Sequence, residues 1–172
     1  MRTITKEQLE DILEKHKKWL NDDEGGERAI MTDADMRGAD MTDAIMTGAI
    51  MSGAIMRGAR NLFIPIACPE DGEFIGFKKC RDNYIVRLKI TADAMRSSST
   101  SRKCRCSKAE VLSITTVDGK DDGTTEAVSQ HDKNFVYRVG ETVEVTEFDE
   151  NRFNECTPGI HFFITREEAV RY

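Results

Sequence analysis

The chain has 172 residues, 39% of them hydrophobic and 33% charged, and a formal net charge of −6. This length suits one or two small domains, and this composition is typical of a soluble globular protein. No apolar run approaches the ~20 residues that a membrane span needs, and the first twenty residues are too charged for a signal peptide. We therefore expect a cytoplasmic protein without membrane contact, and the negative charge argues against general nucleic-acid binding.

The first predicted element is a helix over residues 6–20. Thr5 is a suitable N-cap and Gln8 follows three residues later, as in a capping box. An apolar stripe then runs along one helical face at Leu9, Ile12, Leu13, His16 and Leu20. This face would suit a partner protein, but it would also suit the open end of the repeat that follows. We favour the second role, because the terminal repeats of solenoids need a cap.

The second predicted element is a repeat with a period of five residues. Ala recurs at positions 29, 34, 39, 44, 49, 54 and 59, and Met at positions 31, 36, 41, 46, 51 and 56. A period of five fits neither an α-helix, at about 3.6, nor a strand, at 2. The segment from Ala29 to Arg60 resembles the pentapeptide-repeat family, whose pattern is A-(D/N)-L-x-x.

That resemblance implies a right-handed quadrilateral β-coil in which four pentapeptides make one turn and Ala and the central residue point inward. Met replaces the usual central Leu or Phe here, and its flexible side chain fills a core less rigidly. Four isoleucines occupy the outward slot usually held by Asp or Asn: Ile30, Ile45, Ile50 and Ile55. An outward apolar patch predicts docking, either of another chain as a homo-oligomer or of the third segment.

The third segment is predicted to be β-rich, with strands at 73–79, 84–90, 110–117, 142–147 and 160–164. Residues 81–83 are expected to form a hairpin turn, and Thr165 with Glu168 predicts a capped terminal helix. The expected fold is thus mainly β: a capping helix (1–26), a short pentapeptide coil (27–64) and a barrel or sandwich domain ending in a helix (65–172).

The order of these parts also resembles a group of phage and prophage pentapeptide-repeat proteins with a C-terminal domain of unknown function. The resemblance rests on KKWLNDDEGGERA, ACPEDGEFIGFKKC, RSSSTSRKCRCSKAEVLSI and NECTPGIHFFITREEAVRY. It implies a phage setting, and hence the cytoplasm of a bacterial host, but no established activity.

A basic, hydroxyl-rich stretch at residues 95–108 is the strongest candidate site. It holds five basic residues and no acidic one. Arginine binds phosphate in bidentate fashion, and serine hydroxyls and loop amides add further donors. The alternative is an exposed, solvated loop. The ligand-binding residues predicted here are Arg96, Ser97, Ser98, Ser99, Ser101, Arg102 and Lys103.

Basic residues of the predicted hairpin extend this candidate site. Arg87 and Lys89 share one strand face, and Lys79 joins them if the two strands pair. If that face met the basic stretch, a basic cleft would result. The alternative is a solvated outer face.

The cysteines and histidines give no motif for a metal or for catalysis. The five cysteines lack C-x-x-C spacing and are expected to be thiols, most of them buried. Cys156 and His161 could form a nucleophilic pair, but no motif supports it, and a packed histidine is the more common case. We expect no metal, no cofactor and no enzyme activity.

The favoured hypothesis is a non-enzymatic protein that sequesters a small anionic nucleotide-like ligand, such as a host-defence signal, with the coil as an oligomerisation scaffold. The alternative is a protein-interaction adaptor or a virion-associated protein. Mimicry of DNA against topoisomerases is disfavoured, because the repeat makes under two turns and carries Ile where acids would be needed.

Overall fold

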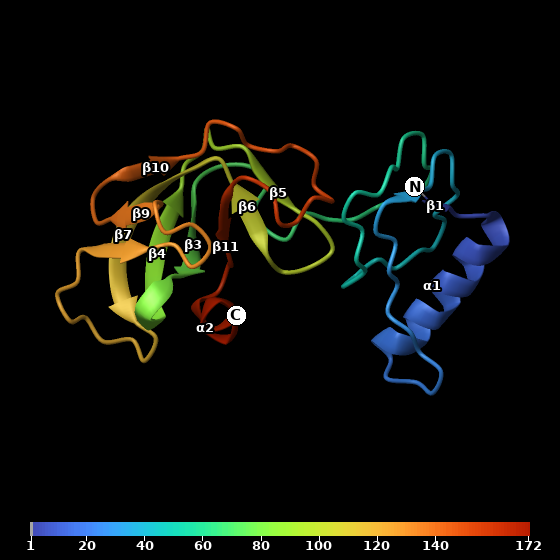
Figure 1. Cartoon of the computed structure of the whole chain (residues 1–172), viewed down its shortest axis with the longest axis horizontal. Helices are drawn as coiled ribbons and strands as arrows, with labels where there is room; N and C mark the ends of the chain where they lie inside the picture. Colours follow the sequence, from blue (N-terminus) through green and yellow to red (C-terminus); the bar gives the residue numbers. More distant parts are fainter. Residues whose placement is uncertain (1) are drawn as a thin grey trace. The chain divides into compact units, whose positions relative to one another are not determined.

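The computed structural model describes residues 2–172, which divide into two compact units (Figure 1). Unit 1 contains the chain up to Pro65, together with Ser99–Ser101 and Asn151–Glu155. Unit 2 contains Ile66–Ser98, Arg102–Glu150 and Cys156–Tyr172. The protein is mainly β with two α-helices among the described residues.

In unit 1, strand β1 (Arg2–Thr3) is followed by helix α1 (Lys6–Leu20), whose bounds match the prediction. The capping box is confirmed: the amide of Gln8 donates to Thr5 Oγ1 at 3.3 Å, and the amide of Thr5 donates to Gln8 Oε1 at 3.0 Å. These bonds satisfy two amides that no helical carbonyl can reach. The apolar face of α1 packs against the repeat through buried Leu9.

The repeat pairs residues that lie twenty positions apart. Parallel bridges join Ile30 to Ile50, Asp35 to Ile55 and Asp40 to Arg60, and β1 adds a parallel partner to β2 (Ala34–Asp35). The inward positions are alanines and methionines, as expected. The buried members of this core are Ala29, Met31, Ala34, Met36, Met41, Met46, Ala49, Met51 and Ala54.

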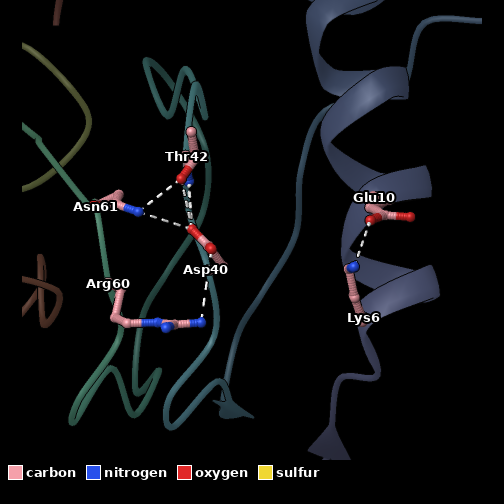
Figure 2. A network of polar contacts seen from close by, with 6 residues as sticks. All are labelled: Lys6, Glu10, Asp40, Thr42, Arg60 and Asn61. Carbon is pink, nitrogen blue, oxygen red and sulfur yellow. Dashed lines mark hydrogen bonds and ion pairs between the residues drawn. The ribbon is translucent and has the colours of Figure 1, made fainter.

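A polar network joins segments of the repeat that lie about twenty residues apart (Figure 2). The Asp40 carboxylate accepts from the hydroxyl of Thr42 at 2.7 Å and from the side-chain amide of Asn61 at 3.1 Å, and Arg60 lies 3.7 Å away. These contacts lower the pKa of Asp40 to about 2, chiefly through the Thr42 and Asn61 hydrogen bonds. The acid in the usual Asp/Asn slot thus binds the segment about twenty residues later.

His16 joins α1 to the repeat at two points. Its Nδ1 accepts from the amide of Ala29 at 3.2 Å, and its Nε2 lies 3.1 Å from the carbonyl of Thr47. Since an amide can only donate and a carbonyl can only accept, this pair of contacts selects the neutral Nε2–H tautomer. The ring is fully buried and stacks on Trp19. Burial lowers the pKa of His16, and the charge of Arg28 adds to the lowering.

Unit 2 is built on an open antiparallel sheet of four strands in the order β10-β7-β4-β3 (Figure 1). Its strands are β3 (Phe74–Lys79), β4 (Tyr84–Ile90), β7 (Lys108–Thr116) and β10 (Thr142–Glu144). A three-stranded sheet has the order β11-β6-β5, from β5 (Arg96–Ser98), β6 (Cys104–Cys106) and β11 (Ile160–Phe162). A ribbon of β8 (Glu126–Val128) and β9 (Val136–Arg138) and helix α2 (Arg166–Arg171) complete the unit.

Of the expected barrel or sandwich, the barrel is wrong, because the strands form separate sheets and no sheet of the described residues closes on itself. The long strands were predicted correctly, with β10 and β11 shorter than expected. The hairpin turn is confirmed: residues 81–83 connect β3 to β4, and Asp82 and Asn83 both have positive φ. The capping box of Thr165 and Glu168 at α2 is also confirmed.

Close packing between strands fixes the interior of unit 2. Gly76 of β3 has no room for a side chain, since an added Cβ would lie 2.6 Å from the ring of Phe162. Phe162 in β11 is completely buried, and the neighbouring Phe163 exchanges two 2.8 Å backbone hydrogen bonds with Phe77. Gly76 therefore allows β11 to lie directly against β3.

The four isoleucines of the outward slot differ in exposure. Ile30 and Ile45 are 59% and 54% exposed, whereas Ile50 and Ile55 are half-buried. Ile30 and Ile50 are bridge partners on the same side of the repeat, as their spacing predicted. No partner chain is present, so their role in assembly stays a prediction.

Replacing Met41 tests the core of the repeat. Met41 is 1% exposed. We expect Met41→Ala to lower the free energy of unfolding of unit 1 by about 2–5 kcal/mol, because it leaves a cavity. Met41→Leu should cost less than about 1.5 kcal/mol, since it keeps the volume. Urea unfolding followed by the fluorescence of Trp19, the single tryptophan, measures both. Equal losses in the two variants would contradict a packed core.

The buried His16 predicts an acid-sensitive unit 1. Its pKa is lowered in the folded state, so the unfolded chain binds the proton first as pH falls. The stability of unit 1 should therefore decrease from about pH 6.5 downward until the pH passes the folded pKa. Trp19 fluorescence during urea unfolding at several pH values measures this slope. His16→Gln should flatten it, and the exposed His131→Gln should not.

Candidate functional site

Arg96, the first residue of the predicted site, binds backbone carbonyls of unit 2. Its guanidinium donates to five backbone carbonyls at 2.9–3.3 Å, so all five of its N–H groups are used. These carbonyls belong to Pro69, Gly72, Thr91, Ala92 and Ala94. The group also lies over the ring of Phe74, 5.2 Å from its centroid. Arg96 thus closes a loop and has no donor left for an anion.

The hydroxyls of the predicted site are buried rather than open to a ligand. Ser97, Ser98 and Ser99 are only 4–5% exposed. Ser98 Oγ accepts from the amide of Ala67 at 2.7 Å, within unit 2. Ser99–Ser101 belong to unit 1, where the hydroxyl of Thr100 donates to the carbonyl of Ala49. The stretch is divided between two units and does not form the open loop that an anion nest requires.

The basic residues of the hairpin share a face, as predicted, but Lys79 and Lys89 have other partners. The register places Lys79, Arg87 and Lys89 on one side of the β3–β4 pair. Lys89 Nζ pairs with Glu110 at 2.7 Å, and Lys79 Nζ donates to the carbonyl of Val170 at 3.1 Å.

Arg96 does not join this face. It stacks on Phe74, whose side chain points to the opposite side of β3, and Arg102 pairs with Glu168 at 2.7 Å. The predicted combination of these residues into one basic cleft is therefore not formed.

A pocket of about 620 Å³ in unit 2 provides a better candidate site. Its volume lies in the range that small-molecule sites occupy. It is lined by residues of β3, β9, β10 and β11 and of the segments between them. The lining residues are Lys78, Lys103, Ser129, His131, Asp132, Phe135, Tyr137, Glu144, Val145, Thr146, Glu147, Cys156, Thr157, Pro158, Gly159, His161 and Tyr172.

Lys78 and Tyr137 are two of the deeply buried polar members of this pocket, together with Ser129. The first two are 6% and 1% exposed, and the Lys78 ammonium lies 5.9 Å from the centroid of the Tyr137 ring. Within residues 2–172, the Lys78 ammonium has no hydrogen bond or ion pair, and the Tyr137 hydroxyl has no hydrogen bond. A charge on a largely buried side chain is costly without a counter-ion, and both polar atoms remain open to the pocket.

Like charge adds to the cost of burying Lys78. Burial lowers its pKa, and the nearby ammonium of Lys103 lowers it further. Burial also raises the pKa of Tyr137 well above its ordinary value, so this hydroxyl remains protonated. The two ammonium groups and the phenol therefore face the pocket as donors. An anion placed among them would be stabilised by both charges.

The pocket also combines aromatic, thiol and charged groups. Lys103 Nζ lies 3.8 Å from the sulfur of Cys156 and 5.8 Å from the centroid of the Tyr172 ring. Phe135 packs on Tyr137 with ring centroids 5.2 Å apart. The lining carboxylates are all exposed and come from Asp132, Glu144 and Glu147. The pocket is thus cationic where it is buried and acidic where it meets solvent.

Of the predicted ligand-binding residues, only Lys103 lines this pocket. Lys78 was missed, although the sequence contained a signal for it. Lys78 alternates with Phe74 and Gly76, and in the structure it pairs with Val86 across the hairpin. A lysine in the inward series of an otherwise apolar strand face is unusual, and that position points to a function.

A second hollow, of about 880 Å³, lies in unit 1 between α1 and the repeat. Charged side chains that line it are paired with one another: Arg37 with Asp35, Arg60 with Asp40, and Lys6 with Glu10 (Figure 2 shows the last two pairs). These pairs satisfy the charges without a ligand. The hollow therefore lacks the uncompensated charge that marks the pocket of unit 2.

Comparison with known sequence families gives two matches. Residues 27–59 match the pentapeptide repeats, and residues 64–169 match DUF5758, a family of unknown function. The second match covers more than half of the chain. The protein belongs to this family. The pocket lies in the part of the chain that the DUF5758 match covers, except for Tyr172.

No curated protein and no solved structure matches the chain. Within residues 2–172, three or more metal-ligating side chains do not gather at any point. None of the helices in this range has the length and apolar character of a membrane span.

Lys78→Met tests whether this lysine destabilises the fold. We expect the free energy of unfolding at neutral pH to rise by about 1–3 kcal/mol, because an apolar side chain of similar size replaces an unpaired buried charge. The pKa of Lys78 in the folded protein lies below its ordinary value of 10.5, so the unfolded chain binds more protons between these two pKa values. The free energy of unfolding of the wild type should therefore rise with pH in that range, and the difference in stability between wild type and Lys78→Met should narrow. Urea unfolding at pH 7 and pH 9.5 measures it.

Lys120→Met is the matched control, since this side chain is 80% exposed and pairs only with Asp118 at 2.8 Å. It should change stability by no more than about 0.5 kcal/mol. A Lys78→Met protein that unfolds at lower urea concentration than the wild type would assign Lys78 a structural role and remove it from the site.

Proposed function

We propose that this protein binds a small anionic ligand of the nucleotide type in the pocket of unit 2 and sequesters it without chemical change. The observation that supports this most is the buried Lys78 ammonium, which has no counter-ion in the described chain and lies beside the charge of Lys103. A phosphate group would supply the missing negative charge. Evolution retains a destabilising buried charge chiefly where function uses it.

The remaining lining of the pocket fits the rest of a nucleotide. Phe135 and Tyr172 offer aromatic surface for a planar base, and Thr157 and the Tyr137 hydroxyl offer hydrogen bonds. The exposed acids at the solvent side can accept from ribose hydroxyls or an exocyclic amine. In the phage setting that the order of the parts implies, the natural ligand is a nucleotide signal of host defence in the bacterial cytoplasm.

We further propose that residues 27–60 form a short right-handed quadrilateral coil that serves as a scaffold. The parallel bridges at a spacing of twenty residues support four pentapeptides per turn. The exposed Ile30 and Ile45 support a role in homo-oligomer formation. An adaptor role, in which the same isoleucines bind a different protein, is the second candidate. Light scattering on the wild type and on Ile30→Lys/Ile45→Lys separates the two, since only self-association changes the mass of the purified protein.

Isothermal titration against cyclic nucleotides, cyclic dinucleotides and ADP-ribose-type nucleotides tests ligand binding. We expect at least one of them to bind, and Lys78→Met to weaken it by about 30-fold or more, the loss expected when a buried charge loses its partner. Lys120→Met should bind like the wild type. Chromatography of the ligand after incubation should recover it intact.

Three results would count against the proposal. If no nucleotide of the panel binds to the wild type, the ligand class is wrong. If Lys78→Met binds as tightly as the wild type, the ligand lies elsewhere. If the recovered ligand is cleaved, the protein is an enzyme rather than a sequestering protein.

A further inference from the structure

Cys156 differs from the other four cysteines in its exposure. Cys68, Cys80, Cys104 and Cys106 are 0–5% exposed, whereas Cys156 is exposed and lines the pocket of unit 2. An accessible thiol is a precondition for exchange with disulfides. Exposure alone does not make a binding site, so the groups around the sulfur determine which reactants it would accept.

Two features of those surroundings favour an anionic reactant. Lys103 donates toward the Cys156 sulfur, with 3.8 Å between Nζ and Sγ. In the same pocket, Lys78 is only 6% exposed, and its ammonium has no hydrogen bond or ion pair within residues 2–172. A molecule that reaches the sulfur with negative groups attached would therefore meet one ammonium at the sulfur and a second one in the same pocket.

We propose that Cys156 exchanges with small anionic disulfides, of which oxidised glutathione is the model, and that the attached half occupies the pocket. The Cys156 thiol first loses its proton to solvent. Its sulfur then attacks one sulfur of the disulfide, a Cys156–glutathione S–S bond forms, and the S–S bond of the reagent breaks. The released glutathione thiolate takes a proton from solvent, so one thiol and one disulfide yield one mixed disulfide and one thiol.

The buried thiols are poor competitors for this reaction. Burial raises the pKa of Cys80 to about 11 and that of Cys106 to about 12, so both remain protonated. Cys68 is the relevant comparison, because a hydrogen bond from Cys104 lowers its pKa, with a contribution from the charge of Arg96. Its side chain is only 5% exposed, which leaves no path for a disulfide in the folded protein. Cys68→Ser is therefore the matched control for Cys156→Ser.

Intact-mass spectrometry of the reduced protein after incubation with oxidised glutathione tests the site. We expect one adduct on the wild type and on Cys68→Ser, and none on Cys156→Ser. Peptide mapping should place the adduct on Cys156. An adduct on another cysteine, or an unmodified wild type, would overturn the proposal.

A second test compares an anionic with a neutral disulfide. If Cys156 reacted only because it is accessible, Lys103 would not affect the two reagents differently. Lys103→Met should slow exchange with oxidised glutathione by about tenfold, the scale of local electrostatic attraction. It should leave exchange with the neutral hydroxyethyl disulfide within about twofold, because that reagent has no carboxylate to attract. Lys120→Met should change neither rate. Equal slowing with both reagents would show that Lys103 only positions the loop and would overturn the anionic preference.

The proposal uses the pocket of the proposed function, but it can fail separately. Exchange is measured without a nucleotide, and nucleotide binding is measured on fully reduced protein. Exchange at Cys156 without nucleotide binding would refute only the proposed function, and binding without exchange would refute only this inference. Where both hold, the glutathionylated protein should lose nucleotide binding, and reduction with dithiothreitol should restore it.

Discussion

The register of the β3–β4 hairpin determines what the pocket of unit 2 contains. Lys78 lies opposite Val86, and this register follows from a turn in which Asp82 and Asn83 both adopt left-handed backbone conformations. Asparagine and aspartate tolerate that conformation better than other non-glycine residues do. A slip of one residue would point Lys78 outward and Phe77 inward. The turn therefore contributes to the position of the Lys78 ammonium, which lies 5.9 Å from the centroid of the Tyr137 ring.

The same strand brings the opposite wall of the pocket into place. Because Gly76 has no side chain, Phe162 packs directly on β3, and its neighbour His161 then lines the pocket. Side chains alternate along a strand, so one close contact in the core fixes the direction of the next residue. The site is thus built from a glycine that permits the approach of β11 and a lysine that the core would otherwise exclude.

Local signals in the sequence predicted local structure well. Both capping boxes, the bounds of α1 and the hairpin turn depend on residues within about five positions of one another. The candidate site was predicted less well because its hydrogen bonds are long-range. Thr100 donates to Ala49, 51 positions away, and Arg96 is used up by carbonyls as far as Pro69. A run of serines and arginines carries no information about such partners, so its composition suggested an open loop.

The distribution of unpaired charge separates the scaffold from the site. In the hollow of unit 1, Asp35 pairs with nearby Arg37, and Asp40 binds Asn61 and Arg60 about twenty residues later. Those charges stabilise the repeat itself and need no ligand. In unit 2, Lys78 contributes nothing comparable, since burial lowers its pKa and no carboxylate offsets the cost. The charges in the hollow of unit 1 are paired, whereas the charge of Lys78 in the pocket of unit 2 is not. This difference indicates that a ligand would bind in the pocket of unit 2.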